Sequence, residues 1–212
     1  MKQAQREKRM KQEGAKMKGA ADACLHCLGV ISDTHGVLPQ EAVDALMGVY
    51  DETQVYEQWF SGERRKLPQM KSEMIVHAGD ILRQSTLDEL EAYAPVLAVN
   101  GNCDYGDFFT KRGWTRAFES FIFHGVRIAV LHKPSDLRIA CDGGIMQPAY
   151  IAPAPRLRIH GHTHTPRIVA CNEHVLLCPG SPSRPREGTK PSIARVYVQE
   201  GDLIAIELVE LI

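Results

Sequence analysis

Short apolar runs that stop at polar residues recur through the first half of the chain. They lie at residues 28–32, 74–80 and 95–104. Runs of this kind are typical of strands buried in a parallel sheet. Between them, residues 39–50 and 85–94 repeat apolar side chains at helical spacing, with Pro39 at the start of the first helix and Ser85 as the expected N-cap of the second. This half of the chain predicts alternating strands and helices.

The second half consists of paired apolar runs with short polar turns between them. Residues 120–132 turn at His124-Gly125, residues 192–211 turn at Glu200-Gly201, and residues 167–181 form a third pair. Each pair predicts a β-hairpin, and residues 156–160 predict one more strand. Strands alternating with helices and then followed by hairpins predict an α/β fold built from layers.

Five of the predicted strands end beside side chains that can bind a metal ion. These side chains are Asp33 and His35, Asp80, Asn100, His132, and His162 and His164. In layered α/β folds, ligands bind beyond the carboxyl ends of the strands, where residues from distant parts of the sequence meet. Imidazole, carboxylate and amide groups without a thiolate suit Mn, Fe, Zn or Ni. The pattern therefore predicts a metal site at these strand ends.

Length and charge limit the class of protein. The chain has 212 residues, of which 44% are hydrophobic, and a net charge of −1, which is enough for one sizeable core. No run approaches the ~18 apolar residues of a membrane span, and the start of the chain lacks the apolar stretch of a secretory signal. We therefore expect a cytoplasmic protein with no membrane partner. The six cysteines do not form a secreted framework and are expected to be thiols.

Positive charge is concentrated at the start of the chain. Residues 1–27 carry seven Lys or Arg against three acidic residues. We expect residues 1–24 to form a basic, disordered extension and residues 25–212 to fold as one domain. The extension would bind phosphates only weakly, and no specific nucleic-acid partner is expected. Cys24 and Cys27 lack the second pair of a structural zinc site, so we interpret them as an incidental pair.

Five sequence motifs carry a family resemblance. They are SDTHG (32–36), HAGDI (77–81), VNGNCD (99–104), VLH (130–132) and IHGHTH (159–164). In this order they resemble the motifs of the calcineurin-like metallophosphoesterases, in particular the small bacterial and archaeal phosphodiesterases of the YfcE type. CPGSPSRPR, at 178–186, is similar to a proline–arginine stretch of the same subgroup. The resemblance covers residues 28–212.

The resemblance implies a four-layer sandwich, in which two mixed β-sheets are flanked by helices, and two divalent metal ions. Mn is the expected ion, and Ni, Fe, Zn and Mg are compatible with the same ligands. One ion would be held by Asp33, His35 and His164. The other would be held by Asn100, His132 and His162. Asp80 would bridge the two at the ~3.5–4 Å spacing that supports in-line displacement at phosphorus, whereas His160 is expected to support the site without binding a metal.

Three residues of the third motif are expected to take part in catalysis. Asn100 would position the reacting groups. Cys103 and Asp104 stand where many relatives have a histidine followed by an acid. A thiol has a pKa of about 8.5 and is a weak hydrogen-bond donor, which favours substrates with good leaving groups. The alternative for Cys103 is a small side chain that fills space in the core.

Two further features depart from the family pattern. Lys133 follows a predicted metal ligand where relatives usually have glycine, and it would either meet a substrate phosphate or stay in solvent. Residues 50–72 look like an insertion between the first two motifs. Their apolar side chains are Val55, Tyr56, Trp59 and Phe60. These would pack in the core, cover the metals or form an oligomer contact.

The resemblance implies a hydrolase of small phosphate esters, most often a phosphodiesterase. A hydroxide that bridges the metals would attack phosphorus in line. One alternative is a phosphomonoesterase. Another is a non-catalytic interaction scaffold, like the retromer subunit that shares the fold and has lost part of the metal set. A homo-oligomer is compatible with either function. Because all seven ligand positions hold competent residues here, the sequence favours the enzyme.

Overall fold

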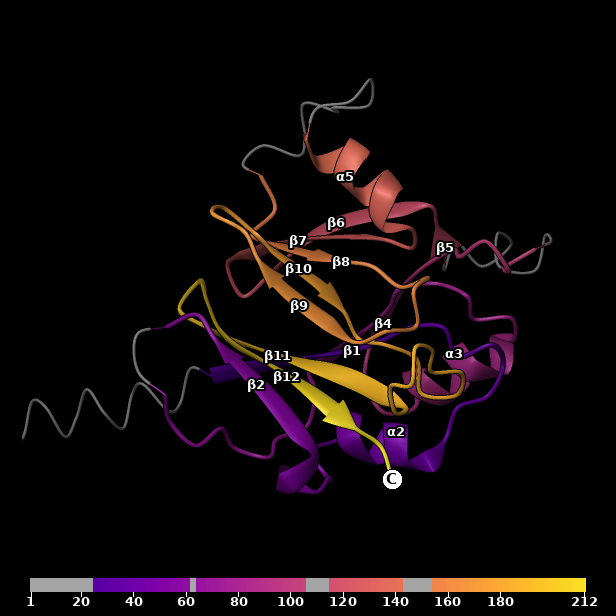
Figure 1. The fold of residues 1–212 in the computed structure, drawn as a ribbon, viewed down its shortest axis with the longest axis horizontal. Coiled ribbons are helices and arrows are strands. Elements are labelled where there is room, and N and C mark those ends of the chain that lie inside the picture. The colour runs from indigo at the N-terminus through magenta and orange to yellow at the C-terminus, as the bar shows by residue number, and fades with distance from the viewer. Residues whose placement is uncertain (1–24, 62–63, 106–114, 143–153) are drawn as a thin grey trace, which may run out of the picture.

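The computed structural model describes residues 25–61, 64–105, 115–142 and 154–212. Within these ranges the chain forms two mixed β-sheets and a small number of helices (Figure 1). The α/β class and the two mixed sheets predicted from the sequence are therefore confirmed. The basic extension expected at residues 1–24 lies outside the described residues.

The larger sheet has seven strands in the order β2-β12-β11-β1-β3-β4-β5. The strands are β1 (Leu25–Ile31), β2 (Val55–Trp59), β3 (Met74–His77), β4 (Val96–Val99), β5 (Thr115–Arg116), β11 (Ser192–Gln199) and β12 (Asp202–Glu210). Strands β1, β3, β4 and β5 run parallel to one another. Their carboxyl ends therefore lie at one edge of the sheet. The other pairings, through β11, β12 and β2, are antiparallel.

The smaller sheet has five strands in the order β6-β7-β8-β10-β9. The strands are β6 (Phe118–Phe123), β7 (Val126–Leu131), β8 (Leu157–Ile159), β9 (Arg167–Ala170) and β10 (Val175–Cys178). Strands β7, β8 and β10 are parallel, whereas β6 and β9 are antiparallel edge strands. The carboxyl ends of β7 and β8 therefore also lie together.

Helices cover the outer faces of both sheets. In Figure 1, α2 (Gln40–Leu46) and α3 (Gln84–Glu91) lie beneath the larger sheet, and α5 (Pro134–Asp142) lies above the smaller one. Leu46 of α2 packs with Ile31 and Ile75 of the larger sheet, and Leu137 of α5 packs with Ala129 of the smaller sheet. Helices and sheets together form the four layers that the resemblance implies.

The main hydrophobic core fills the space between the two sheets. Buried side chains of the larger sheet, such as Leu28, Val30 and Val76, pack with Ile128 and Ile159 of the smaller one. Each fully buried aliphatic side chain contributes about 1.5–3 kcal/mol to folding. The inner strands are covered on both faces, which explains why their sequences are continuously apolar instead of alternating. This core holds the two sheets in a fixed relation, and with them the loops at their carboxyl ends.

Two of the predicted hairpin turns have the expected geometry. His124 and Gly125 have φ values of 43° and 89°, and Glu200 and Gly201 have φ values of 51° and 88°. Two successive residues with positive φ are what a tight turn between twisted antiparallel strands requires. The β6–β7 and β11–β12 hairpins are therefore confirmed at the predicted residues.

Local details differ from the sequence prediction in three places. The helix predicted at 85–94 begins at Gln84 after Arg83, so Ser85 lies inside the helix and its assignment as N-cap is wrong. Residues 134–142 form a helix, α5, that the pattern did not reveal. Within the predicted insertion, Val55–Trp59 form edge strand β2 of the larger sheet.

The apolar side chains of residues 50–72 divide between core and surface. Val55, Trp59 and Phe60 pack against three different hydrophobic clusters, whereas Tyr56 is 61% exposed. Core packing, the most ordinary of the three interpretations, therefore describes most of this stripe. Strand β2 is separated from β1 by β12 and β11, which places it away from the strand ends that carry the predicted metal ligands.

A buried arginine links helix α2 to the larger sheet. Arg195, in β11, has no exposed surface. Its guanidinium donates hydrogen bonds to the carbonyls of Ala45 (2.6 Å), Leu46 (3.2 Å) and Met70. Its Nε lies 3.4 Å from the carboxylate of Glu207, which is itself 3% exposed. The guanidinium thus adds to the hydrogen bonds that Gly48 N–H donates to Ala45 O (3.1 Å) and Ser72 N–H donates to Leu46 O (3.0 Å) at the end of α2.

The cysteines that the structure describes agree with the sequence analysis. Cys27, Cys103, Cys141, Cys171 and Cys178 are free thiols. Cys27 is buried, and burial raises its pKa to about 11, so it is poorly suited to redox chemistry; Cys24 lies outside the described residues. Within the described ranges, none of the helices has the length and apolar character needed to cross a membrane.

Candidate metal centre

The strand ends of the two sheets bring the predicted ligands together. Asp33 and His35 follow β1, Asp80 follows β3, Asn100 follows β4, His132 follows β7, and His162 and His164 follow β8. The loops after β1 and β3 are joined by backbone hydrogen bonds, with Asp33 N–H donating to Gly79 O (2.9 Å) and His35 N–H to Asp80 O (3.0 Å). Within the smaller sheet, the loops after β7 and β8 are joined in the same way, with Gly161 N–H donating to His132 O (3.0 Å).

Five of the predicted ligands have a left-handed backbone conformation. The φ values are 54° for Asp33, 47° for His35, 55° for Asp80, 69° for His162 and 60° for His164. Outside glycine this conformation costs roughly 1–2 kcal/mol per residue, and it concentrates at functional sites where the surroundings hold it in place. The repeated turns aim successive side chains toward one point. This is a structural reason to treat the strand ends as a site.

Two glycines allow the loops to approach closely. A Cβ atom on Gly101 would lie 2.0 Å from Asp80 Oδ1, and one on Gly161 would lie 1.9 Å from Ser32 Oγ and 2.6 Å from Asp33 Oδ2. No other residue fits at either position without displacing a carboxylate of the site. The motifs GNCD and HGH therefore need glycine for packing.

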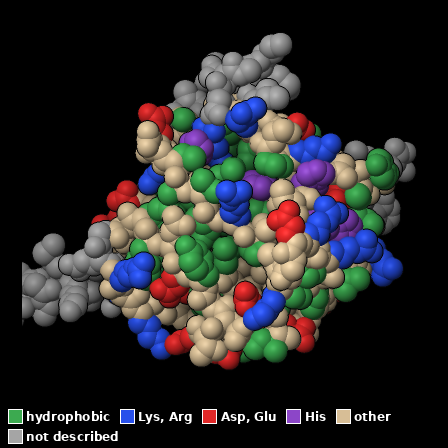
Figure 2. All heavy atoms as spheres, in the orientation of Figure 1, with side chains coloured by type: hydrophobic (Ala, Val, Ile, Leu, Met, Phe, Trp, Pro, Cys, Tyr) green, Lys and Arg blue, Asp and Glu red, His purple; other side chains and the backbone are tan. Residues whose placement is uncertain are grey.

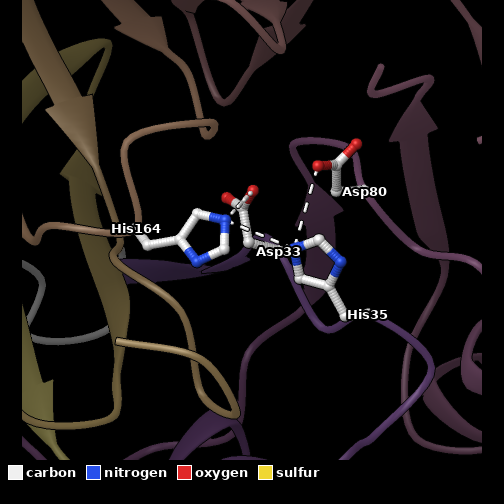
Figure 3. Close-up of side chains that lie close together, drawn as sticks. All are labelled: Asp33, His35, Asp80 and His164. Atoms are coloured by element: carbon white, nitrogen blue, oxygen red, sulfur yellow. Dashed lines mark hydrogen bonds and ion pairs between the residues drawn. The ribbon is translucent and has the colours of Figure 1, made fainter. Parts of the chain in front are cut away.

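Four of the ligands form one compact group. One ligand atom each from Asp33, His35, Asp80 and His164 lies within 4.8 Å of the others (Figure 3). His164 Nε2 is 3.1 Å from Asp33 Oδ1, and His35 Nε2 is 3.8 Å from Asp80 Oδ2. The two ring nitrogens, Nε2 of His35 and Nε2 of His164, are 3.2 Å apart. Two carboxylates and two imidazoles facing one point match the ligand chemistry of a divalent transition metal.

Hydrogen bonds to backbone carbonyls orient two of the histidines. His164 Nδ1 donates to Arg184 O (2.5 Å), and His132 Nδ1 donates to Ala78 O (2.7 Å). In a neutral imidazole, the proton is then on Nδ1, and Nε2 carries a lone pair that faces a carboxylate. A lone pair that faces a carboxylate is unfavourable, and either a proton on Nε2 or a metal ion between the two groups removes the repulsion. Such hydrogen bonds are the usual way in which metal-binding histidines are fixed.

The remaining ligands lie on the other side of Asp80. His132 Nε2 is 3.5 Å from Asp80 Oδ1, and the rings of His132 and His162 are 5.2 Å apart between centroids. His132 Nε2 and Asn100 Oδ1 are buried and make no hydrogen bond with any described residue. Buried polar atoms without partners are costly, and a metal ion would satisfy both. The residues present therefore fit divalent ions on both sides of Asp80.

The pKa values of the histidines and of Asp80 are shifted by the contacts between these imidazoles and carboxylates. Hydrogen bonding to Asp33 raises the pKa of His164. Burial works against a charged His132, but Asp80 and Asp33 outweigh it and raise its pKa. Burial also works against a charged Asp80, yet His132 and the N–H of Cys103 hold its pKa well below the usual range. The Asp80 carboxylate therefore stays ionised and attracts positive charge.

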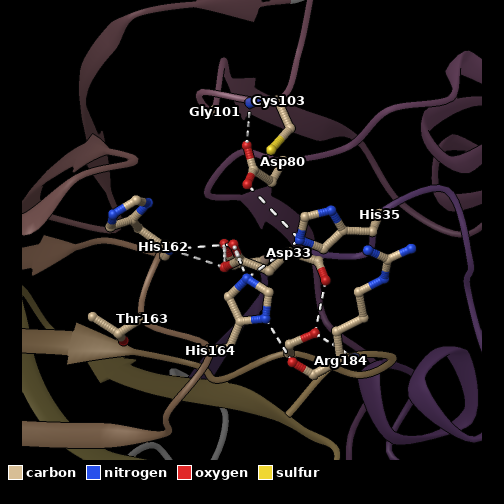
Figure 4. Close-up of polar contacts among 12 residues, drawn as sticks. Asp33, His35, Asp80, Gly101, Cys103, His162, Thr163, His164 and Arg184 are labelled. Carbon is tan, nitrogen blue, oxygen red and sulfur yellow. Dashed lines mark hydrogen bonds and ion pairs between the residues drawn. The ribbon is translucent and has the colours of Figure 1, made fainter. Parts of the chain in front are cut away.

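His162 holds the site partly through its backbone. Its N–H donates to Asp33 Oδ2 (3.0 Å), and Ser32 Oγ donates to the same oxygen (2.6 Å). In Figure 4 its ring lies on the side of Asp33 away from His35. Burial lowers its pKa, as do the charges of His132 and Lys133, so the ring is neutral at pH 7 and able to bind a metal.

The third motif links two loops around Asp80. The carboxylate of Asp104 accepts N–H groups from Ile81, Leu82 and Gly101, each at 2.8 Å, and Cys103 N–H donates to Asp80 Oδ1 (2.8 Å). The Cys103 side chain is only partly buried, which does not fit a core filler. Burial and the nearby Asp80 raise its pKa, so this residue is a thiol at neutral pH.

Positive side chains surround the candidate centre. Burial lowers the pKa of His35, and the charge of Arg184 acts in the same direction. Burial likewise lowers the pKa of His162, with Lys133 among the charges that add to the effect, and Arg186 Nη1 donates to His162 O (3.5 Å). Figure 4 shows the Arg184 side chain extending beside His35, and Figure 2 shows histidines gathered with Lys and Arg on the right of the visible face. This charge suits an anionic ligand beside the metals.

Two histidines lie behind the site. His160 is buried, and its Nδ1 donates to Gly161 O (2.8 Å), which agrees with a supporting role. His77, which the sequence analysis did not single out, is fully buried: its Nδ1 accepts Gly79 N–H (3.3 Å), and its Nε2–H donates to Thr34 Oγ1 (3.0 Å). It joins the loops after β1 and β3. His77 is the first residue of the HAGD motif, but the sequence pattern alone does not show whether this histidine binds a metal or supports the loops.

We expect His77 to make folding stability pH-dependent. Burial lowers its pKa from 6.5 to about 3, so the unfolded chain takes up a proton below pH 6.5 that the native state excludes. Stability is then lost as the pH falls. In metal-free protein, His77→Gln keeps a side-chain N–H donor and should reduce the loss of unfolding free energy between pH 7 and pH 5 by about 2 kcal/mol. Urea unfolding at both pH values measures this, and an unchanged pH dependence would contradict it.

Two facing mixed sheets that bring carboxylates, imidazoles and an amide to one edge define a metal-binding α/β sandwich. The family profile of the calcineurin-like phosphoesterase superfamily domain matches residues 27–201. The chain belongs to this superfamily, as the sequence motifs indicated.

Relatives and solved structures agree with this assignment. A probable metallophosphoesterase of Methanocaldococcus jannaschii is 33% identical over 189 residues, which cover 85% of this chain and 81% of that protein. Vps29 from Cryptosporidium parvum has a TM-score of 0.62 at 17% identity, covering 89% of this chain and 93% of that one. The phosphoesterase YfcE from Escherichia coli has a TM-score of 0.52 at 18% identity, covering 88% and 100%. At these identities, the two structures show a shared fold.

Proposed function

We propose that this protein is a binuclear metal-dependent phosphodiesterase. The observation that carries the proposal is the pair of buried atoms without hydrogen-bond partners, His132 Nε2 and Asn100 Oδ1, beside the compact group around Asp33 and His164. Asp80 lies between the two sets and has a carboxylate oxygen for each. Two adjacent ligand sets that share a carboxylate suit two ions better than one.

In this proposal the side chains of the centre would bind the metal ions, orient the substrate and stabilise its negative charge. Asp33, His35 and His164 would bind one divalent ion, Asn100, His132 and His162 the other, and Asp80 both. When bound, the ions would supply an activated water and neutralise charge on the phosphoryl oxygens. Lys133 and Arg184 would bind the remaining phosphate oxygens, and Asn100 would help to fix the phosphorus in line. These are positioning and electrostatic roles, which dominate phosphoryl transfer.

The diester is the preferred substrate in this proposal because Cys103, which stands where many relatives have a histidine, would be a weak proton donor for the leaving group. The thiol of Cys103 has a raised pKa and donates hydrogen bonds poorly. Asp104, whose carboxylate accepts three backbone N–H groups, would position the Cys103 loop. Bis-p-nitrophenyl phosphate should be hydrolysed faster than p-nitrophenyl phosphate when both are assayed with Mn, Ni, Mg and Zn. Faster hydrolysis of the monoester with every metal would favour a phosphomonoesterase.

We expect metal-saturated protein to retain two ions in the candidate centre. The count is made on the His124→Asn variant. This substitution removes one ligand of a separate histidine cluster, described below, so that an ion bound there is not counted with those of the centre. After saturation with Mn and gel filtration, elemental analysis should give close to two ions per chain, since seven competent ligands are available. A firm value of one would leave a mononuclear site.

An interaction scaffold is the second candidate, and the Vps29 likeness is the observation in its favour. The two functions differ in one measurement. A scaffold with bound metal would hydrolyse neither nitrophenyl ester above the rate of the Asp33→Asn variant. The proposed enzyme would exceed that rate with at least one metal.

A further inference from the structure

A second cluster of metal-binding side chains lies outside the candidate centre. His26 lies in β1, Glu73 immediately precedes β3, and His124 lies in the turn between β6 and β7. Within the described residues, one ligand atom from each of the three lies within 4.8 Å of the other two. His26 belongs to the larger sheet and Glu73 lies directly before one of its strands, whereas His124 belongs to a hairpin of the smaller sheet. The cluster therefore joins the two halves of the sandwich.

Both histidines contact the same carboxylate. His26 Nδ1 is 2.8 Å from Glu73 Oε1, and His124 Nε2 is 2.8 Å from Glu73 Oε2. The two rings are stacked, with centroids 3.3 Å apart and an interplanar angle of 7°. Side-chain exposures of 27%, 39% and 38% for His26, Glu73 and His124 leave the group open to ions from solvent.

The backbone holds these side chains in place. Glu73 N–H donates to Cys27 O (2.9 Å), which fixes it beside β1. The turn that carries His124 rests on the β11–β12 turn, because a Cβ on Gly125 would lie 2.7 Å from Gly201 Cα. The ring of Phe123 packs edge-on against His124 at 4.7 Å. The three ligands are thus brought together by both sheets, so the unfolded chain would not assemble them.

The choice of histidine in this turn is unusual. His124 has a φ of 43° at a turn position where asparagine, aspartate or glycine is preferred. Folding alone would be served better by asparagine. The histidine instead supplies a nitrogen that faces Glu73.

We propose that His26, Glu73 and His124 form a metal site of their own, which binds one Zn²⁺ or a similar divalent transition-metal ion. Two imidazoles and a carboxylate are a ligand set that zinc accepts, with water in the open position. Each neutral imidazole would bind through the nitrogen that now faces Glu73 and carry its proton on the other nitrogen. The stacked rings would turn apart so that their lone pairs converge on the ion, which their exposed positions permit.

An ion at this site would connect the sheets far more strongly than the present hydrogen bonds. It would bind the native state alone, since the ligands come from three separate segments, and would therefore raise its stability by mass action. The site is separate from the candidate centre, so this inference does not depend on the proposed function.

The test compares His124→Asn with wild type and with His174→Asn, a histidine variant in the β9–β10 connection, outside the cluster. Asparagine suits the turn, so His124→Asn should fold normally. Each full-length protein is dialysed against micromolar free Zn²⁺ and its bound zinc is counted by elemental analysis. His124→Asn should hold one zinc ion fewer per chain than the other two proteins. Its melting temperature should also rise less on addition of zinc.

A second variant separates ligand loss from a change in the turn. Glu73→Gln keeps the size of the side chain but removes its charge, and it should lose the same ion. Equal zinc counts in wild type, His124→Asn and Glu73→Gln would overturn the proposal. Loss of zinc in His174→Asn as well would also overturn it, because the effect would then not be specific to the cluster. Failure of hydrolysis would change neither outcome, since the comparison counts ions at a site away from the strand ends.

Discussion

Asp80→Asn is expected to lower hydrolysis of phosphate esters by more than ~100-fold, in line with losing part of a two-metal clamp worth several kcal/mol. The asparagine side chain has the same size but lacks the charge that both ligand sets share. Asp80 Oδ2 faces His35 and Asp80 Oδ1 faces His132, so both proposed metal sites would lose negative charge at once. Elemental analysis should show that at least one ion is lost, together with the fall in hydrolysis rate.

His160→Ala is the matched control for this prediction. His160 lies two residues from His162, but its Nδ1 donates to a backbone carbonyl and it is absent from the compact ligand group. The variant should lose some stability, because a buried side chain is removed, yet keep its metal and most of its activity. Loss of metal in His160→Ala together with normal metal content in Asp80→Asn would show that the ligands have been assigned wrongly.

Arg195→Met is expected to lower the free energy of unfolding by about 3–5 kcal/mol. The substitution removes the hydrogen bonds that the guanidinium donates to the carbonyls of Ala45, Leu46 and Met70. It also leaves the buried carboxylate of Glu207 without its cation. The hydroxyls of Tyr50 (2.8 Å) and Tyr197 (2.9 Å) still donate to Glu207, but they carry no charge. Chemical denaturation of the metal-free proteins measures the loss.

A double variant tests whether the unpaired charge causes this loss. Arg195→Met combined with Glu207→Gln removes both charges, so its destabilisation should be smaller than the sum of the two single changes. Strict additivity would show that the arginine acts through its carbonyl contacts alone.

Much of the architecture could be predicted because the strands and turns of this fold leave clear local patterns in the sequence. Inner strands covered on both faces are continuously apolar, and each of the turns at His124-Gly125 and Glu200-Gly201 has a glycine at a position with positive φ. The ligand-bearing strand ends were visible for the same reason, since each apolar run stops at the polar group that follows it. The local pattern and the overall fold agree at these positions.

The parts that were missed depend on contacts across the fold. Pro134 looks like the end of a strand but is the first residue of α5, a position that proline also suits. Ser85 fits an N-cap by type, yet the helix starts one residue before it. Arg195 lies in an apolar strand, and its burial depends on partners in other elements, namely the carbonyls of α2 and the carboxylate of Glu207 in β12. The role of His77 likewise depends on Thr34, 43 positions away.

The loops of the candidate centre are joined largely by main-chain groups, and this has an evolutionary consequence. An N–H that donates to a carbonyl or to Asp33 Oδ2 does so whatever side chain its residue carries. Sequences can therefore change widely around the site, provided that glycine persists at positions 101 and 161, where no Cβ fits. A recognisable fold shared with Vps29 at 17% identity is what this arrangement allows. Function can then change through exposed side chains around the site while the backbone of these loops keeps its conformation.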